Sequence, residues 1–454
     1  MSFGLWLGDI IFLVNLSTWS CLHEHNITDK KSIYTKDTKM KKIGVLLLLS
    51  LSACQSWTTK SNLSAENREP ASKKDESSYF KSVSDQERDE IIKRSHAFKN
   101  EDRQISNVRI QDLLAEKCGP DYKYTHNAET GEYSWPTVTC HYKPDSDLTG
   151  MSSKFKCDFP SDKGDTDTRK VKYSTSAVNP TSSEVLEVFL GSTLSKLMGF
   201  SAATYCPVQL VCKDCPGSDP WSRNRSSAAP EVGSTQKFNY ALVEFKQKGF
   251  EVNSRPPNPK PQGLAWEELR KVSGSAQEQK EELIDREVWM MFIHFLRHYD
   301  ADPHNQKVLC TKTKEKSDSS EASRKYSCEE SYVLTSDFGL SYPRGYVFIW
   351  DEPVAEQKGD ECIGTLKKGL IGGAPGTGII LGTSFSEEAR QKFLKQIEQI
   401  TDGQWKELYG IAQYGSLTHI SIDNWVETTR RKIQKLKKLN CPAFDTGKST
   451  LSHN

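Results

Sequence analysis

The stretch His298-Tyr299-Asp300-Ala301-Asp302-Pro303-His304-Asn305, together with the later Asp337-Phe338-Gly339, decides how this chain is interpreted. The first segment fits the pattern H-x-D-x-x-x-x-N, and the second is D-F-G. Phosphoryl transfer needs one carboxylate to orient the attacking hydroxyl, and an amide and a second carboxylate to hold the metal ions that bridge the phosphates. Asp300, Asn305 and Asp337 supply these groups in this order, so we expect them to form a catalytic centre.

These motifs make the chain resemble the protein-kinase-like superfamily, in particular its atypical HipA-like and phosphoinositide-kinase-like branches. The resemblance extends over about residues 150–440, and its specific motifs lie within 298–339. It implies an α+β, bilobed fold with a small β-rich lobe containing one helix (150–250) and a large, mostly helical lobe (264–441). It also implies ATP with Mg²⁺ or Mn²⁺ as cofactor, Asn305 and Asp337 as metal ligands, and a protein or small molecule as the phosphoryl acceptor.

The expected nucleotide site begins on a hairpin predicted for residues 153–173. In a kinase-like small lobe, a strand lysine holds the nucleotide phosphates and a glutamate on the following helix pairs with it. The resemblance assigns this lysine to Lys172. Lys170 remains the alternative because it lies on the same face of the strand, two residues earlier. A solvated strand face, on which neither lysine binds a ligand, is the other interpretation of this segment.

The partner glutamate is expected on an amphipathic helix predicted for residues 181–198. Glu187 lies deeper in this helix than Glu184 and is therefore the preferred partner, although either could be a solvated glutamate. Further along, Glu244 belongs to a strand predicted for residues 240–245. The place of that strand fits the segment leading to the hinge, where the chain would meet the adenine ring.

A long helix is predicted from Ser275 to Arg297, directly before the first motif. Its second half, Val288–Leu296, is apolar around most of its circumference. A helix with this pattern is buried rather than half-exposed. We therefore expect it to form the centre of the large lobe and to deliver the loop 298–305.

Composition indicates which classes of protein and which cellular compartments are compatible with this chain. The chain has 454 residues and a formal net charge of +1, which argues against a nucleic-acid binder, since these usually carry a basic excess. Its 12 cysteines are many for a reducing compartment and favour an oxidising one.

The N-terminal region predicts a lipid anchor. Met40 is a better candidate than Met1 for the start of the translated protein, because two lysines and a short apolar run follow it, as in a signal peptide. The run ends at Leu51-Ser52-Ala53-Cys54, which resembles the lipobox of bacterial lipoproteins. The resemblance implies lipidation of Cys54, cleavage before it, and a place in the bacterial cell envelope, facing the periplasm or the exterior. Residues 1–39 would then precede the true start of the protein. The alternative to a cleaved lipoprotein signal is a signal anchor, or a buried apolar segment that is never cleaved. The polar residues 55–105 are expected to be a disordered tether.

The cysteines predict disulfide bonds. Cys118 and Cys140 lie at the ends of a small β-hairpin element expected in residues 106–148, and we predict that they pair. Cys310 and Cys328 bracket a polar insert and are also predicted to pair. For the Cys212-Lys213-Asp214-Cys215-Pro216 segment, structural disulfides are preferred. A zinc ribbon needs a second cysteine pair at suitable spacing, and none is present. A redox motif needs a helix N-terminus, whereas the residues after Cys215 predict a loop.

Two other functions compete with the kinase interpretation. Asp302 occupies the position where many protein kinases have a lysine that contacts phosphate, so the domain could be an inactive, pseudokinase-like binding module of the envelope. A metal-dependent hydrolase built on Asp300, Asp302, His304 and Asp337 is a third interpretation. Residues 442–454 are expected to form a tail.

Overall fold

The computed structural model describes residues 77–99, 101–119, 121–144, 153–160, 166–174, 183–216, 234–245, 247–253, 264, 266–299, 305–315, 326–335, 337–339, 350–366, 383–413 and 420–445. The chain divides into the units 1–58 and 59–454, and all described residues belong to the second. Among them, no helix combines the length and the apolar character that crossing a bilayer requires. The anchor residue Cys54 and the catalytic-loop residue Asp300 lie outside the described residues.

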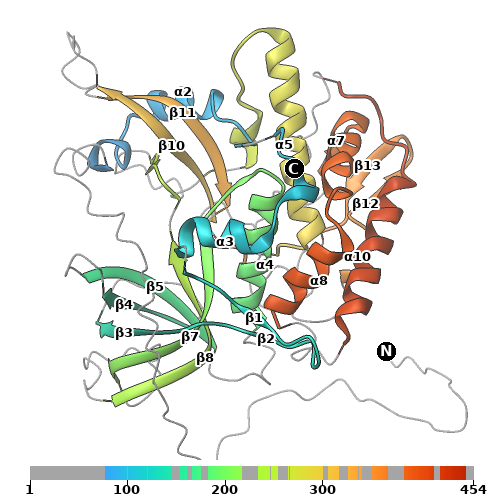
Figure 1. The fold of residues 1–454 in the computed structure, drawn as a ribbon. Coiled ribbons are helices and arrows are strands. Elements are labelled where there is room, and N and C mark those ends of the chain that lie inside the picture. Colours follow the sequence, from blue (N-terminus) through green and yellow to red (C-terminus); the bar gives the residue numbers. More distant parts are fainter. Residues whose placement is uncertain are drawn as a thin grey trace, which may run out of the picture. The chain divides into compact units, whose positions relative to one another are not determined.

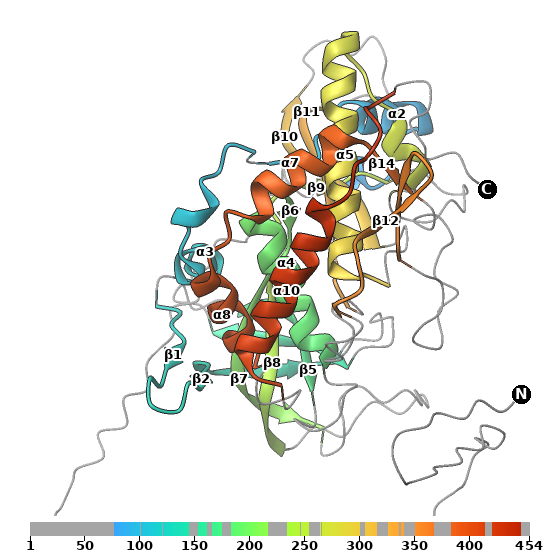
Figure 2. The same ribbon diagram turned by 90° about the vertical axis from the view of Figure 1, so that its right-hand side faces the viewer.

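The described residues form a mixed α+β fold (Figures 1 and 2). Its helices are α2 (Asp85–Lys93), η1 (Ile105–Asn107), α3 (Ile110–Cys118), α4 (Ser183–Leu197), η3 (Trp266–Arg270), α5 (Ala276–Leu296), α7 (Glu387–Ile397), α8 (Asp402–Ile411) and α10 (Ile422–Lys437). Its strands are β1 (Thr125–His126), β2 (Tyr133–Ser134), β3 (Thr137–Lys143), β4 (Lys154–Pro160), β5 (Thr166–Ser174), β6 (Ser201–Ala202), β7 (Thr204–Cys215), β8 (Ser234–Phe245), β9 (Phe250–Glu251), β10 (Gln306–Glu315), β11 (Tyr326–Thr335), β12 (Ala355–Lys358), β13 (Glu361–Gly364) and β14 (Ser384–Phe385).

A closed barrel contains the strand that carries Lys172. Its strands follow the order β3-β4-β5-β8-β7, and a parallel pairing between β3 and β7 closes it. Alternate residues of the strands point inward, so aromatic rings meet: Phe238 lies 4.7 Å from Tyr173 and 5.5 Å from Phe155, between ring centroids. The predicted hairpin 153–173 is confirmed as β4 and β5, which pair antiparallel.

A second sheet, in the order β6-β11-β10-β9, carries both sequence motifs at one end. Helix α4 lies in sequence between the barrel strand β5 and the strand β6 of this sheet, and it packs on β7 and β6. The predicted helix 181–198 is therefore present, and it follows β5 as expected.

Helix α5 is the central element of the helical part, as predicted. Ser275 caps its N-terminus and forms a capping box with Glu278, and its residues from Ile284 to Leu296 are buried. It packs on α7, while α10 packs on α7 and α8 (Figure 2). Arg297, in the left-handed conformation (φ 55°), ends the helix and turns the chain toward the first motif.

The N-terminal segment differs from the expected tether. Residues 77–99 are ordered, contain α2 and bury Phe80, Ile91 and Ile92. The Arg286 guanidinium donates hydrogen bonds to the carbonyls of Ile92 (3.0 Å) and Ser95 (2.6 Å). A few apolar side chains and one buried arginine thus hold a stretch whose polar composition predicted disorder.

The cysteine pairing is only partly as predicted. Cys118 ends α3 and bonds Cys206 of β7, whereas Cys140 of β3 bonds Cys157 of the neighbouring strand β4, so the predicted Cys118–Cys140 bridge is wrong. The hairpin expected within residues 106–148 is present as β1 and β2, and helix α3 precedes it. Among the described residues, the other bridges are Cys310–Cys328, as predicted, Cys212–Cys215, and Cys362–Cys441.

Candidate functional site

The strand pair β10·β11 brings the two motifs together. Gln306 opposes Thr335 in the antiparallel register, and their side chains share a buried hydrogen bond of 2.9 Å. Asn305 directly precedes this pair, and Asp337 follows it by two residues. The two predicted metal ligands therefore leave the sheet at the same end, which sequence distance alone did not guarantee.

Lys172 and Asp337 form the centre of the candidate site. The Lys172 ammonium donates to both carboxylate oxygens of Asp337, at 2.8 Å and 2.6 Å. The lysine side chain is 1% exposed and the aspartate side chain 24%, so the pair is closed on the lysine side and open on the carboxylate side. The Gly339 amide also donates to the Asp337 carboxylate, at 2.9 Å.

The charges around Asp337 keep its carboxylate ionised. Burial by itself raises the pKa of this group, but the Lys172 and Lys170 charges and the hydrogen bonds from Lys172 and Gly339 outweigh burial, and the pKa lies well below its usual range. A carboxylate that stays negative and is partly exposed suits a divalent cation, which prefers oxygen ligands.

The structure distinguishes the two candidate lysines. Lys170 lies on the same strand face as Lys172 but pairs with the Glu244 carboxylate on β8, as the register of Val171 with Val243 dictates. Lys172 is therefore the lysine that reaches Asp337. Glu244, predicted to lie near the adenine, is 8% exposed in its side chain and engaged with Lys170.

Glu187 lies on α4 with a fully buried side chain. Its position on a helix that packs beside the barrel agrees with the helix expected to carry the partner of Lys172. The pairing of Glu187 with Lys172 stays a prediction. Of the hydrolase set, Asp302 and His304 lie, like Asp300, outside the described residues.

A close contact that the sequence analysis missed fixes the position of the second motif. Phe338 packs against α4 at Gly191, where an added Cβ would lie 2.7 Å from the Phe338 Cβ and Cγ atoms. The Phe338 ring also contacts His298 (centroids 5.5 Å apart) and Phe292 of α5 (6.4 Å). A glycine inside an apolar helix was the available sequence signal.

Burial lowers the pKa of His298 to about 4, although Asp337 and the Gly339 backbone act in the opposite direction.

Arg297 connects the start of the first motif to the segment after the second. Its guanidinium donates to the Tyr299 hydroxyl (2.9 Å) and to Thr365 Oγ1 (3.1 Å), and it pairs with the Glu352 carboxylate. The side chain is fully buried. These bonds hold the entrance to the loop 298–305 against residues 352–365.

Comparisons with known proteins add one structural likeness. The crystal structure of a Helicobacter pylori proinflammatory kinase, CtkA, is similar with a TM-score of 0.35 and 9% sequence identity, over 67% of this chain and 100% of that chain. No protein-family profile and no curated protein matches the chain. At so low a TM-score, the interpretation of the site depends on the contacts described above.

Proposed function

We propose that this chain is a lipid-anchored protein of a bacterial cell envelope whose kinase-like domain binds ATP with Mg²⁺ or Mn²⁺ and transfers the γ-phosphoryl group to a hydroxyl. The observation that carries the proposal is the bidentate contact between Lys172 and Asp337. A buried ammonium beside an ionised, partly open carboxylate offers one group to a phosphate and the other to a metal ion.

The residues fit a nucleotide-bound metal ion. Asp337 supplies a carboxylate and Asn305 an amide oxygen from the neighbouring loop, and Mg²⁺ sites of this kind combine few protein oxygens with waters and phosphates. The metal would neutralise charge on the transferred group. Lys172 would then hold a phosphate oxygen, with Glu187 as its proposed partner, while Asp300 would orient the acceptor hydroxyl.

An inactive binding module is the second candidate, and Asp302 favours it. A carboxylate where many kinases have a phosphate-contacting lysine repels the γ-phosphate. A module of this kind would use the same surface to hold an envelope partner and would not turn over ATP.

A thermal-shift titration tests nucleotide binding. A ligand that binds only the folded state raises the unfolding free energy by about 2.7 kcal/mol at a concentration 100 times its Kd. We expect ATP to raise Tm in the presence of Mg²⁺ or Mn²⁺ and to lose this effect when EDTA is added. An unchanged Tm with ATP and either metal would contradict nucleotide binding and leave the binding-module function.

A further inference from the structure

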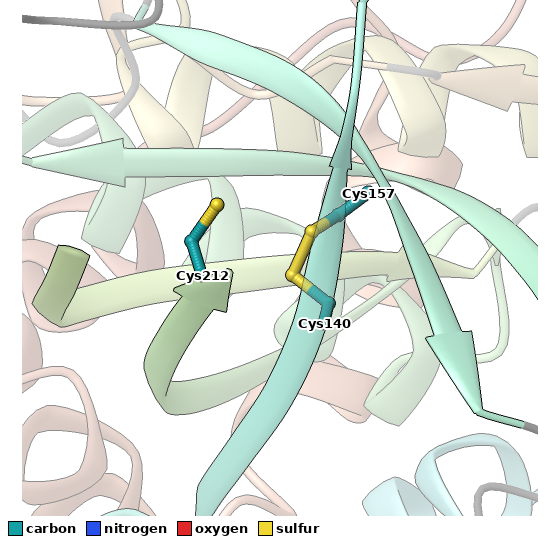
Figure 3. Close-up of side chains that lie close together, drawn as sticks. All are labelled: Cys140, Cys157 and Cys212. Carbon is teal, nitrogen blue, oxygen red and sulfur yellow. A yellow bond between two sulfur atoms is a disulfide. The ribbon is translucent and has the colours of Figure 1, made fainter. Parts of the chain in front are cut away.

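Three buried sulfur atoms that belong to two different disulfides lie close together on the barrel strands β3, β4 and β7. Figure 3 shows the three cysteines that carry them. The Sγ atoms of Cys140, Cys157 and Cys212 are all within 4.8 Å of one another, and the three side chains are fully buried. Cys140 bonds Cys157, and Cys212 bonds Cys215. The Cys212 sulfur of one bridge is thus a close neighbour of the Cys140–Cys157 bridge.

The register of the barrel favours a third pairing among the same atoms. Cys140 and Cys212 are direct partners across the parallel strands β3 and β7. Adjacent strands lie about 4.8 Å apart, and disulfides join residues whose Cα atoms are roughly 4.4–6.8 Å apart. A Cys140–Cys212 bond therefore requires side-chain rotation and no separation of the strands.

A buried cation lies on the side of the cluster where Cys157 sits. Arg169 opposes Cys157 across β4 and β5, and directly opposed residues in an antiparallel pair share a face. Its side chain is 6% exposed, its guanidinium lies 3.7 Å from the centre of the Phe245 ring, and it pairs with Asp167. Its Nε has no hydrogen-bond acceptor among the described residues. The register therefore places the buried Arg169 side chain on the same face of the sheet as Cys157.

We propose that the barrel contains a thiol–disulfide exchange site whose substrate is a dithiol reductant. The dithiol reduces Cys212–Cys215, giving two thiols and itself becoming a disulfide. The Cys212 thiol then loses its proton, and the thiolate attacks Cys140 Sγ: the Cys140–Cys212 bond forms, the Cys140–Cys157 bond breaks, and the electron pair leaves on Cys157 Sγ, which takes up a proton. Arg169 is the strand partner of Cys157. The reductant thus enters at one bridge, and a thiol emerges at the other.

The position of Cys215 allows the first step. Cys215 ends β7, and the register between β7 and β8 shifts between Cys212 and Cys215. Both cysteines of this bridge are fully buried, but strand ends open more readily than strand centres, so we expect the reductant to reach the bridge when the strand end opens. Every described cysteine is in a disulfide, and thiolates, not disulfide sulfurs, are the metal ligands; exchange, not metal binding, is therefore the chemistry of the oxidised protein.

Partial reduction of the wild-type protein is the first test. The protein is exposed briefly to dithiothreitol, quenched in acid, labelled with an alkylating agent and mapped as peptides. In molecules labelled at Cys215, we expect the second label at Cys157 and a Cys140–Cys212 bridge. Labels at Cys212 and Cys215 with an intact Cys140–Cys157 bridge would overturn the proposal.

Substitution provides a test without any reductant. In C215S, Cys212 has no partner, and we expect a Cys140–Cys212 bridge with a free thiol at Cys157. The matched control C328S leaves Cys310 free, with no second disulfide described beside it, and should keep all other bridges. Retention of Cys140–Cys157 in a folded C215S protein would contradict the proposal.

The role of Arg169 has its own readout, the rate of exchange. Leaving thiols of lower pKa leave faster, so loss of the guanidinium should slow release of Cys157 by roughly threefold to tenfold. Dithiothreitol pulses of increasing length, applied to wild-type protein and R169Q, give the rate at which the Cys157 label appears in molecules labelled at Cys215. An unchanged rate would overturn the assignment of Arg169.

Discussion

The Lys172 ammonium contacts both carboxylate oxygens of Asp337, although 165 positions separate the two residues in the chain. The contact joins the barrel strand β5 to the end of β11. The ammonium and the carboxylate neutralise each other's charge. When a nucleotide and a metal ion bind, the phosphate must therefore share or replace the contact to Lys172, and the metal ion the contact to Asp337. The same two residues therefore determine both local stability and the proposed binding.

The two neighbouring lysines should differ sharply in function. K172M removes the cation beside Asp337, so we expect loss of metal-dependent ATP binding and a fall in unfolding free energy of roughly 1–3 kcal/mol, less than for a fully buried pair. K170M breaks the contact with Glu244 and serves as the matched control. ATP titrations monitored by Tm, together with urea unfolding, measure both effects. Equal loss of binding in both variants would contradict the assignment of Lys172.

Gly191 should be intolerant of even a methyl group. In G191A the new Cβ would lie 2.7 Å from Phe338 atoms, so the ring must move, and we expect destabilisation of about 1–3 kcal/mol. G403A is the control, because its nearest non-neighbouring atom, Thr401 Oγ1, is 3.7 Å away. It should be neutral or stabilising by up to about 1 kcal/mol. Urea unfolding distinguishes them, and a neutral G191A would show that the contact yields easily.

Glu287 predicts a pH dependence of stability. Burial raises its pKa from 4.5 to about 7, although hydrogen bonds from Ser386 act in the opposite direction. The folded state therefore binds more protons between these pH values, and this group's contribution to the unfolding free energy falls as pH rises from about 4.5 to about 7.

Replacement by glutamine isolates this contribution. E287Q keeps an acceptor for Ser386 but cannot ionise, so relative to wild type it should gain up to roughly 3 kcal/mol on going from pH 4 to pH 8. Urea unfolding at both values measures the change, with E388Q, a more exposed neighbour, as the control. A constant difference between E287Q and wild type would contradict the buried-carboxylate account.

The parts of the fold and of the site that local sequence patterns determine could be predicted, whereas the parts that depend on contacts between distant segments could not. The apolar run of α5, the β4–β5 hairpin and the order of the two motifs follow from periodicity and short-range spacing. The barrel closure between β3 and β7 and the Cys118–Cys206 bridge, whose cysteines are 88 residues apart, depend on contacts that no local pattern encodes. Lys172 and Lys170 share a strand face, so only tertiary neighbours could separate them.

The lipid anchor makes a prediction of its own. C54S should move the protein from the membrane fraction to the soluble envelope fraction, because a lipidated cysteine is the proposed attachment. Fractionation followed by immunoblotting measures the shift, and C21S, upstream of the proposed start, is the control. Mass spectrometry that finds wild-type Cys54 unmodified and uncleaved would contradict the anchor.

The central claim is that Asp337 holds a metal-bound nucleotide opposite Lys172. Calorimetric titration of ATP into the wild-type protein and into D337N, each with and without Mg²⁺, tests it most directly. D337N keeps the size and an acceptor oxygen, so the fold should remain. We predict metal-dependent binding in the wild type and its loss in D337N. Equal ATP affinity in the two proteins, or no binding by the wild type with Mg²⁺, would contradict the account.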